Sequence, residues 1–340
     1  MLQSLQRLSR PQRQLIFFLV FGGILMAIVA LTIVLVSSAI NTGARPQAFA
    51  IDENLTVREF ATLPDNDAYP AGVAAYGDGV YTGSYASGAI WYIDGAGQVT
   101  EIPGTREGIG AVSGLAVGPD GALYIVDQYD TDVRSGGGDV KRLTPDGTLS
   151  VFATIEDERG FVQPDDVALD GAGRVYVTDR GRNEVWRFEP DGSGGVVWWT
   201  GPQQEANGPR PAVTGLAYDA TTDSMILTDP ETNTLYRVAV ADGSSAVLYQ
   251  HPANAANPPG FDGVTVTPDG TIYIAALGQN GIVRFENDSI TYVAGQFRGS
   301  SDVDYAEGNR LFVSNWDQSS LALPLVEPRL PFGIDVIELP

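Results

Sequence analysis

The stretch DDVALDGAGRVYVTDRGRNEVWRF, residues 165–188, carries the pattern that decides the fold. Apolar residues alternate up to a turn at Asp170-Gly171, a second apolar strand follows and ends in Asp179, and a third strand begins at Glu184. Alternation with a period of two is typical of a β-strand, and an Asp-Gly pair is typical of a tight hairpin. The stretch therefore predicts strands joined by short turns, with a fourth strand, VVWWT, at residues 196–200.

The same pattern occurs six times from residue 70 onward. Each copy opens with a pair of residues at the start of a first strand: Ala71-Gly72, Ser113-Gly114, Asp165-Asp166, Thr214-Gly215, Asp262-Gly263 and Ser301-Asp302. Successive copies are 39 to 52 residues apart. A period of about 40–50 residues with several short strands in each unit is typical of a β-propeller. The sequence therefore predicts an all-β fold, a six-bladed β-propeller over residues 54–340.

The two ends of this region predict how the ring of blades closes. Ile334–Leu339 (IDVIEL) is typical of a third strand without a fourth, and Leu55–Leu63 (LTVREFATL) of a fourth strand without a blade. We expect the N-terminal strand to complete the sixth blade, because this closure removes free sheet edges.

The Asp-Gly pairs separate the two faces of the predicted propeller. Eight of the nine pairs fall where hairpin turns are expected, because glycine accepts the positive φ of a tight turn and Asp tolerates it. The ninth pair, Asp262-Gly263, opens a first strand instead. The longer irregular segments fall on the face that carries the starts of the first strands: residues 128–138, 156–164, 201–211, 251–260 and 318–331. We call this face the loop face and expect function there.

An uncharged apolar run, Leu15–Val36, precedes the propeller. A helix of roughly 20 apolar residues crosses the hydrocarbon layer, so residues 1–36 are predicted to be a cytoplasmic N-terminus and a transmembrane helix. Arg7, Arg10 and Arg13 precede the run, and this excess of positive charge favours a propeller on the extracytoplasmic side.

Residues 37–53 are predicted to be a linker between the helix and the propeller. The apolar run is longer than the apolar part of a signal peptide, which is about 7–15 residues, and this favours a retained single-pass anchor. The alternative is removal of the segment at Ala48-Phe49-Ala50, which is similar to a cleavage site.

Composition excludes several classes of protein. The chain has no cysteine and one histidine, so disulfides, thiol chemistry and His- or Cys-based metal sites are excluded, and a Ser–His–Asp triad would need His251. Residues 1–50 contain four arginines and no acidic residue, which leaves 42 acidic and 16 basic groups on the rest of the chain. That balance disfavours a nucleic-acid partner.

Acidic residues gather where the first strands begin. Asp165 and Asp262 occupy first positions, with Asp166 and Asp302 one step later, and carboxylates that converge on one channel mouth repel unless a positive group lies between them. Oxygen ligands without His or Cys suit a hard cation such as calcium. The alternative is that the second-position carboxylates accept hydrogen bonds from backbone amides of neighbouring blades.

Two stretches resemble known families. GLAVGPDGALYIVD (residues 114–127) and residues 166–188 resemble NHL repeats. DGVTVTPDGTIYIAALGQNGIVRF (residues 262–285) resembles the fifth blade of the senescence marker protein, gluconolactonase and luciferin-regenerating enzyme family, six-bladed propellers that include calcium-dependent lactonases.

The second resemblance implies a metal site in the channel. Asp262 matches the family's aspartate ligand, and the family's asparagine ligand falls on Thr214. The glutamate ligand falls on Ala71, and of the substrate-binding motif Asp165 alone is retained. The resemblance thus implies a divalent cation, calcium, near Asp262, Asp165 and Thr214, with Asp262 as the catalytic residue that holds it.

Three functions follow from these observations. The first is a membrane-anchored extracytoplasmic propeller that binds a small molecule, a cation or a protein partner on its loop face. The second is a divalent-metal-dependent, lactonase-like hydrolase, in which the cation would polarise a carbonyl and activate water. The third is a structural subunit of a membrane complex. Loss of a bound cation on Asp262→Asn would indicate the hydrolase, and co-purification with partners would indicate the subunit.

Overall fold

The computed structural model describes residues 9–40, 46–132, 136–206, 208–322 and 326–340. The chain forms two separate units, which divide between Arg45 and Pro46. Arg7 and residues 41–45 of the predicted linker lie outside the described ranges, as do parts of three of the predicted long loops.

The first unit contains helix α2 (Arg10–Ile40). Its segment Arg10–Thr32 is long and apolar enough to cross a membrane, by length and composition. A signal sequence near an N-terminus meets the same two criteria. The predicted apolar helix is therefore present.

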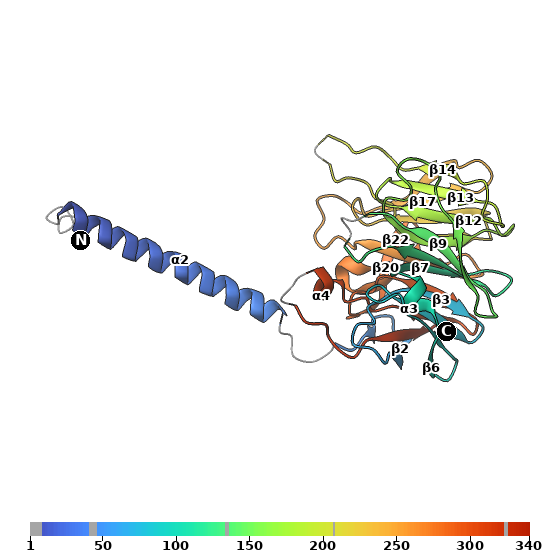
Figure 1. Cartoon of the computed structure of the whole chain (residues 1–340), viewed down its shortest axis with the longest axis horizontal. Helices are drawn as coiled ribbons and strands as arrows, with labels where there is room; N and C mark the ends of the chain where they lie inside the picture. The colour runs from blue at the N-terminus through green and yellow to red at the C-terminus, as the bar shows by residue number, and fades with distance from the viewer. Residues whose placement is uncertain (1–8, 41–45, 133–135, 207, 323–325) are drawn as a thin grey trace. The chain divides into compact units, whose positions relative to one another are not determined.

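The second unit is a six-bladed β-propeller, as predicted (Figure 1). Each blade is built on four antiparallel strands that follow one another from the channel outward. The strands are, in blade 1, β3 (Pro70–Tyr76), β4 (Gly79–Ser84), β5 (Ile90–Ile93) and β6 (Val99–Glu101); in blade 2, β7 (Ala111–Val117), β8 (Leu123–Gln128), β9 (Asp139–Leu143) and β10 (Leu149–Ala153); in blade 3, β11 (Pro164–Leu169), β12 (Val175–Asp179), β13 (Glu184–Phe188) and β14 (Val196–Thr200); in blade 4, β15 (Leu216–Asp219), β16 (Ser224–Asp229), β17 (Thr234–Ala239) and β18 (Ser245–Gln250); in blade 5, β19 (Phe261–Val266), β20 (Ile272–Ala276), β21 (Gly281–Glu286) and β22 (Ser289–Gly295); and in blade 6, β23 (Val303–Ala306), β24 (Arg310–Val313), β25 (Gly333–Glu338) and β2 (Thr56–Thr62). Short helices lie in three connections: α3 (Thr105–Gly108), η1 (Leu277–Gln279) and α4 (Gln318–Ala322).

The N-terminal strand closes the ring as predicted. Strand β2 pairs with β25 from Thr56 opposite Glu338 to Thr62 opposite Gly333, so the two ends of the propeller share blade 6 (Figure 1). A further short strand, β1 (Phe49–Ala50), pairs with β22 as a fifth strand of blade 5. The segment that the sequence predicts as a linker thus includes residues held against the outer edge of a blade.

The apolar core lies between neighbouring blades. One buried cluster combines Tyr124 of blade 2 with Val177 and Phe188 of blade 3, and another combines Val73 of blade 1 with Phe312 of blade 6. Side chains that alternate along each strand face the blades on either side, so each blade completes the core of the next.

Carboxylates of the inner strands join neighbouring blades. Asp302 accepts a hydrogen bond from the backbone N–H of Val73 in blade 1, at 2.8 Å, and Asp166 accepts one from Leu216 in blade 4, also at 2.8 Å. Each also accepts the N–H of the residue that follows it. The prediction that second-position carboxylates bind backbone amides between blades is confirmed for both.

Asp304 makes a third contact of this kind, and the pKa of its carboxyl is raised. Its carboxylate accepts the N–H of Ala75 at 2.8 Å and the hydroxyl of Thr265 at 3.0 Å. Burial raises the pKa of Asp304 to about 6, and the hydrogen bonds from Ala75 and Thr265 offset part of this rise. Burial also raises the pKa values of Asp166 and Asp302.

We expect the propeller to be more stable at pH 5 than at pH 7. A raised pKa means that the folded protein binds a proton more tightly than the unfolded chain, whose Asp pKa is about 3.9, so the free energy of unfolding falls as the pH rises through this interval. The melting temperature measured at pH 5, 6 and 7 checks this. The Asp304→Asn variant should show a smaller difference, and a melting temperature that rises from pH 5 to pH 7 would contradict the expectation.

Candidate functional site

The loop-face end of the channel opens as two connected cavities. An outer cavity of about 420 Å³, the vestibule, is lined by residues that include Arg210, Glu231 and Gln318. An inner cavity of about 30 Å³, the throat, is lined by residues that include Tyr85 and Gln128. Five residues border both cavities: Asp165, Arg180, Thr214, Asp262 and Trp316. These five form the channel mouth.

One residue from each blade reaches the mouth at the same point of the repeat. In each blade a small or polar residue lies at or near the end of the second strand, such as Asp179 in blade 3, and the residue that reaches the mouth comes directly after it. The six are Tyr85, Gln128, Arg180, Pro230, Leu277 and Trp316. Since they occupy equivalent positions in six blades, their side chains form one ring around the vestibule and throat.

In several blades, the residue that directly precedes the ring residue has a structural role. Asp179 accepts the backbone N–H groups of Val162 and Gln163 at 2.7 and 3.0 Å, and Asp127 accepts that of Gly110 at 2.8 Å. Asn315 accepts the N–H of Arg298 at 2.8 Å. These bonds attach the connection between blades to the second strand and so fix the direction of the residue that follows.

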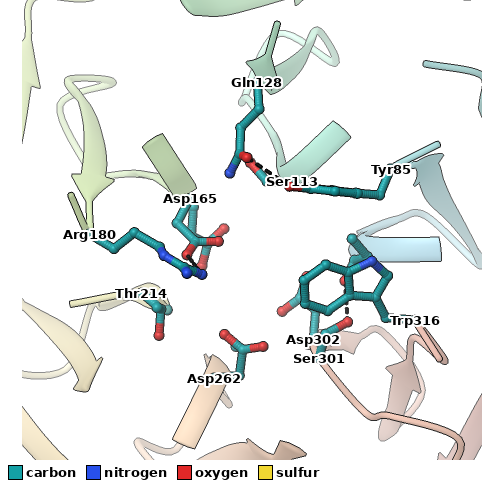
Figure 2. A pocket seen from close by; sticks show the side chains of 14 residues that line it. Tyr85, Ser113, Gln128, Asp165, Arg180, Thr214, Asp262, Ser301, Asp302 and Trp316 are labelled. Carbon is teal, nitrogen blue, oxygen red and sulfur yellow. Dashed lines mark hydrogen bonds and ion pairs between the residues drawn. The ribbon is translucent and has the colours of Figure 1, made fainter. Parts of the chain in front are cut away.

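The structure brings the three predicted metal-binding residues to the same mouth. Asp165 and Asp262 are in β11 and β19, and Thr214 lies just before β15 (Figure 2). Thr214 is buried, and its backbone carbonyl accepts the hydroxyl of Thr178 at 2.6 Å. The three residues therefore lie together, as their positions in the repeat predict. Their roles in binding a metal ion stay predictions.

Arg180 lies among these carboxylates. Its guanidinium forms an ion pair with Asp165, with 3.5 Å between Nη1 and Oδ2, and Figure 2 shows its side chain pointing into the mouth. The nearby Asp165, followed by Asp262, raises the pKa of Arg180, so the guanidinium stays charged. A fixed positive charge thus lies beside the carboxylates that sequence analysis assigned to a cation.

The two first-position carboxyls have raised pKa values. Burial raises the pKa of Asp165, and the charge of Arg180 partly offsets this. Burial, followed by repulsion from Asp165, raises the pKa of Asp262 well above its usual range. The Asp165 side chain is 19% exposed, and this exposed surface faces the cavities, so solvent reaches it through the mouth rather than from the outer surface.

Aromatic and amide side chains form the opposite wall. The Tyr85 hydroxyl donates to Oε1 of Gln128 at 2.9 Å, and Nε2 of Gln128 donates to the carbonyl of Pro164 at 2.7 Å. Trp316 packs edge-to-face on Tyr85, with 5.2 Å between ring centroids. Burial and the charge of Asp165 raise the pKa of Tyr85 to about 12. The wall is therefore held in place by its own contacts and presents an indole edge to the cavity (Figure 2).

These residues do not fit a divalent cation as they stand. Calcium takes six to eight oxygen ligands, and the mouth offers two carboxylates and the Thr214 hydroxyl, with Arg180 beside them. Asp166 and Asp302 already accept backbone amides. Within the described ranges, no group of three or more Asp, Glu, His or Cys residues is arranged to hold a metal ion.

Sequence analysis did not identify Arg180, Trp316, Tyr85 or Gln128 as site residues. The signal was present, because each follows the small or polar residue near the end of a second strand. The single histidine lies outside the mouth: Nδ1 of His251 is 3.1 Å from the hydroxyl of Tyr249, in the connection after β18.

The fold and the mouth define a six-bladed β-propeller with an NHL-type blade. The NHL repeat model matches residues 161–188, which are blade 3 up to the end of β13. The predicted resemblance to NHL repeats is confirmed for this blade.

Known proteins support the same class. The chain is 30% identical over 178 residues to adipocyte plasma membrane-associated protein of Danio rerio, a match that covers 46% of this chain and 41% of that protein. A gluconolactonase from Xanthomonas campestris superposes with a TM-score of 0.60 at 15% identity, covering 87% of this chain and 95% of its own. Streptogramin B lyase superposes with a TM-score of 0.58 at 16% identity, covering 84% and 98%. The predicted resemblance to gluconolactonase propellers is confirmed at the level of the fold.

The inner strands pack tightly around Gly215 at the mouth. A Cβ atom there would lie 2.1 Å from the carbonyl oxygen of Asp262 and 2.6 Å from Oγ1 of Thr228. We expect Gly215→Ala to lower the free energy of unfolding by about 1–3 kcal/mol, because overpacking forces the backbone to shift. Urea denaturation measures this change. Gly208→Ala is the control, since its Cβ would meet nothing nearer than 3.4 Å, and equal effects of the two substitutions would contradict the expectation.

Proposed function

We propose that this protein is a membrane-anchored propeller whose extracytoplasmic body binds a small molecule at the channel mouth. The observation that carries the proposal is the vestibule, which has the volume of a typical small-molecule site. It narrows onto charged, hydroxyl and aromatic side chains from several blades, an arrangement that combines an apolar wall with a few convergent polar groups.

Several observations support a retained anchor. Helix α2 is long enough to span the membrane, and the relative from Danio rerio is named as plasma membrane-associated. The tripeptide that is similar to a cleavage site, Ala48-Phe49-Ala50, overlaps β1, and the N–H of Ile51 donates to the carbonyl of Val293 at 2.8 Å. Cleavage after Ala50 would therefore remove a strand that pairs with blade 5.

We expect the N-terminus to be cytoplasmic and the propeller extracytoplasmic, because Arg10 and its neighbouring arginines precede the apolar run. In intact cells, an added protease should remove an epitope at the C-terminus and leave one at the N-terminus. Lysed cells, in which both epitopes become accessible, are the control. Protection of the C-terminal epitope in intact cells would contradict the proposed orientation.

Trp316 should report on the ligand at the mouth. We expect a compound that binds there to raise the melting temperature of the full chain in detergent, and the Trp316→Ala variant to bind it at least tenfold more weakly, because the indole forms one wall of both cavities. A thermal-shift screen of small polar molecules measures both effects. The control is Trp198→Ala, whose indole packs on Tyr176 of the same blade and borders neither cavity. Equal binding by wild type and Trp316→Ala would place the ligand elsewhere.

The second candidate function is the lactonase-like hydrolase. Structural similarity to a gluconolactonase and the position of Asp262 at the mouth favour it. In that function Asp262, Asp165 and Thr214 would hold a divalent cation that polarises a carbonyl and activates water. The arrangement of Arg180 favours the binding function instead. The structural-subunit alternative would be indicated by partners that stay with the protein during mild detergent extraction.

A further inference from the structure

We propose that Arg180 is the resident cation of the channel mouth. It is the counter-ion of the Asp165 and Asp262 pair, in place of a divalent metal ion, and it binds a carbonyl or carboxylate oxygen of the ligand. The part that concerns the ligand rests on the proposed function, whereas the part that concerns the charge does not.

The first step is the charge balance of the throat. Four carboxyls border it: Asp165, Asp166, Asp262 and Asp302. Asp166 and Asp302 each accept two backbone N–H groups, so hydrogen bonds already solvate them. Of the remaining two, Asp165 forms an ion pair with Arg180, and the charge of Arg180 acts against the rise in the pKa of Asp262. Arg180 is the one basic side chain bordering the throat among the described residues. The mouth therefore has an internal counter-ion and does not require a metal.

The second step is the donor capacity of Arg180. A guanidinium has five N–H donors, and in the ion pair with Asp165 the nitrogen at 3.5 Å is Nη1. The side chain is 34% exposed, and it borders both cavities. Its backbone N–H donates to the carbonyl of Gln163 at 3.0 Å, and among the described residues its guanidinium is paired with no group other than Asp165. Donors thus remain available to a molecule in the vestibule.

The neighbouring arginines differ from Arg180 in this respect. The Arg182 side chain is 4% exposed and forms ion pairs with Asp157 and Glu184 at 2.7 and 2.8 Å. Nη2 of Arg210 donates to the carbonyl of Gly181 at 2.8 Å. Arg182 is committed to protein groups, and Arg210 borders the vestibule but not the throat, so among the described residues Arg180 is the arginine that borders both cavities.

The third step is the chemistry of the ligand. A planar guanidinium binds the oxygens of carboxylate and carbonyl groups in directed hydrogen bonds. The Trp316 indole lies across the mouth from Arg180 and offers apolar surface (Figure 2). We therefore infer a ligand that joins an apolar part to a carbonyl or carboxylate group.

The charge part is tested by calcium binding to the full chain in detergent. We expect excess calcium or a chelator to leave the melting temperature of the wild type unchanged. Arg180→Gln should melt at a lower temperature than wild type, and calcium should raise its melting temperature by several degrees, because the two carboxylates lose their counter-ion. The added substitution Asp262→Asn should abolish that calcium response. Arg180→Lys, which keeps the charge, and Arg210→Gln should both behave as wild type toward calcium.

Two results would overturn the charge part. One is a stoichiometric calcium ion in the wild type that is lost on Asp262→Asn. The other is an Arg180→Gln variant with wild-type stability and no response to calcium. If Arg180→Gln fails to fold, the double variant Asp165→Asn/Arg180→Gln replaces it, because it removes the charged pair together. That variant should fold and should lose binding of the carbonyl probes described next.

The ligand part is tested with three probes of equal size: benzoate, benzamide and benzylamine. We expect benzoate, benzamide or both to raise the melting temperature of the wild type, whereas the cationic benzylamine should not. Arg180→Gln should lose at least tenfold in affinity for the stabilising probe, and Arg58→Gln, at a surface arginine that borders neither cavity, should retain it. Binding of benzoate alone would identify a carboxylate ligand, and equal binding of benzamide a neutral carbonyl.

Failure of this inference can be separated from failure of the proposed function. A molecule that binds the wild type and Arg180→Gln equally, yet loses affinity on Trp316→Ala, would overturn the role of Arg180 and leave the mouth as the binding site. Preferential binding of benzylamine would also overturn it, since the mouth would then attract cations. A third result is that no small molecule binds at the mouth and that calcium does not change the melting temperature of the wild type. This result would contradict the proposed function and the ligand part, but it would be consistent with the charge part.

Discussion

The close approach of six inner strands around one channel is the constraint on which the rest of this structure depends. Gly215 illustrates it, because a Cβ atom there would overlap the carbonyl oxygen of Asp262 in the next blade. A Cβ atom on Gly114 would likewise lie 2.6 Å from the carbonyl oxygen of Asp165. A side chain larger than hydrogen is excluded at these two glycines, whereas Asp166 and Asp302 occupy the same position in blades 3 and 6. The other polar groups of the mouth come from the neighbouring first positions and from the residues that follow the second strands.

Crowding at the axis also determines how each carboxyl is stabilised. Carboxylates removed from bulk water need hydrogen bonds or an opposite charge. Asp166, Asp302 and Asp304 obtain backbone N–H groups from the next blade and so join first strands that have no hydrogen-bonded ladder between them. Asp165 and Asp262 lie one step nearer the loop face and interact with Arg180 instead. Chemically similar residues therefore serve structure or the site according to their depth in the channel.

The sequence was sufficient to predict the blade count, the closure by β2 and the meeting of Asp165, Thr214 and Asp262. All three follow from periodicity, because equivalent positions of a closed repeat converge on one axis. Arg180 was not predicted, because within its own blade it occupies a connection and resembles an ordinary surface residue. Its place at the mouth becomes apparent only when the equivalent residues of the six blades, Trp316 among them, are seen to form one ring. Strand β1 was not predicted either, since a two-residue strand at an edge leaves no periodic pattern.

The choice between a metal ion and an arginine at such a mouth depends on charge and hydration. A calcium ion would bring two positive charges to two first-position carboxyls of raised pKa, and it would have to displace a guanidinium that already lies 3.5 Å from one of them. The ion would also give up a shell of six to eight oxygen ligands for the smaller set of oxygens at the mouth. Arginine brings one charge on a side chain fixed by its own blade, without the loss of an ion's hydration shell. Two carboxyls of raised pKa that share a single negative charge are thus balanced by one guanidinium, and the same guanidinium leaves donors directed at whatever enters the vestibule.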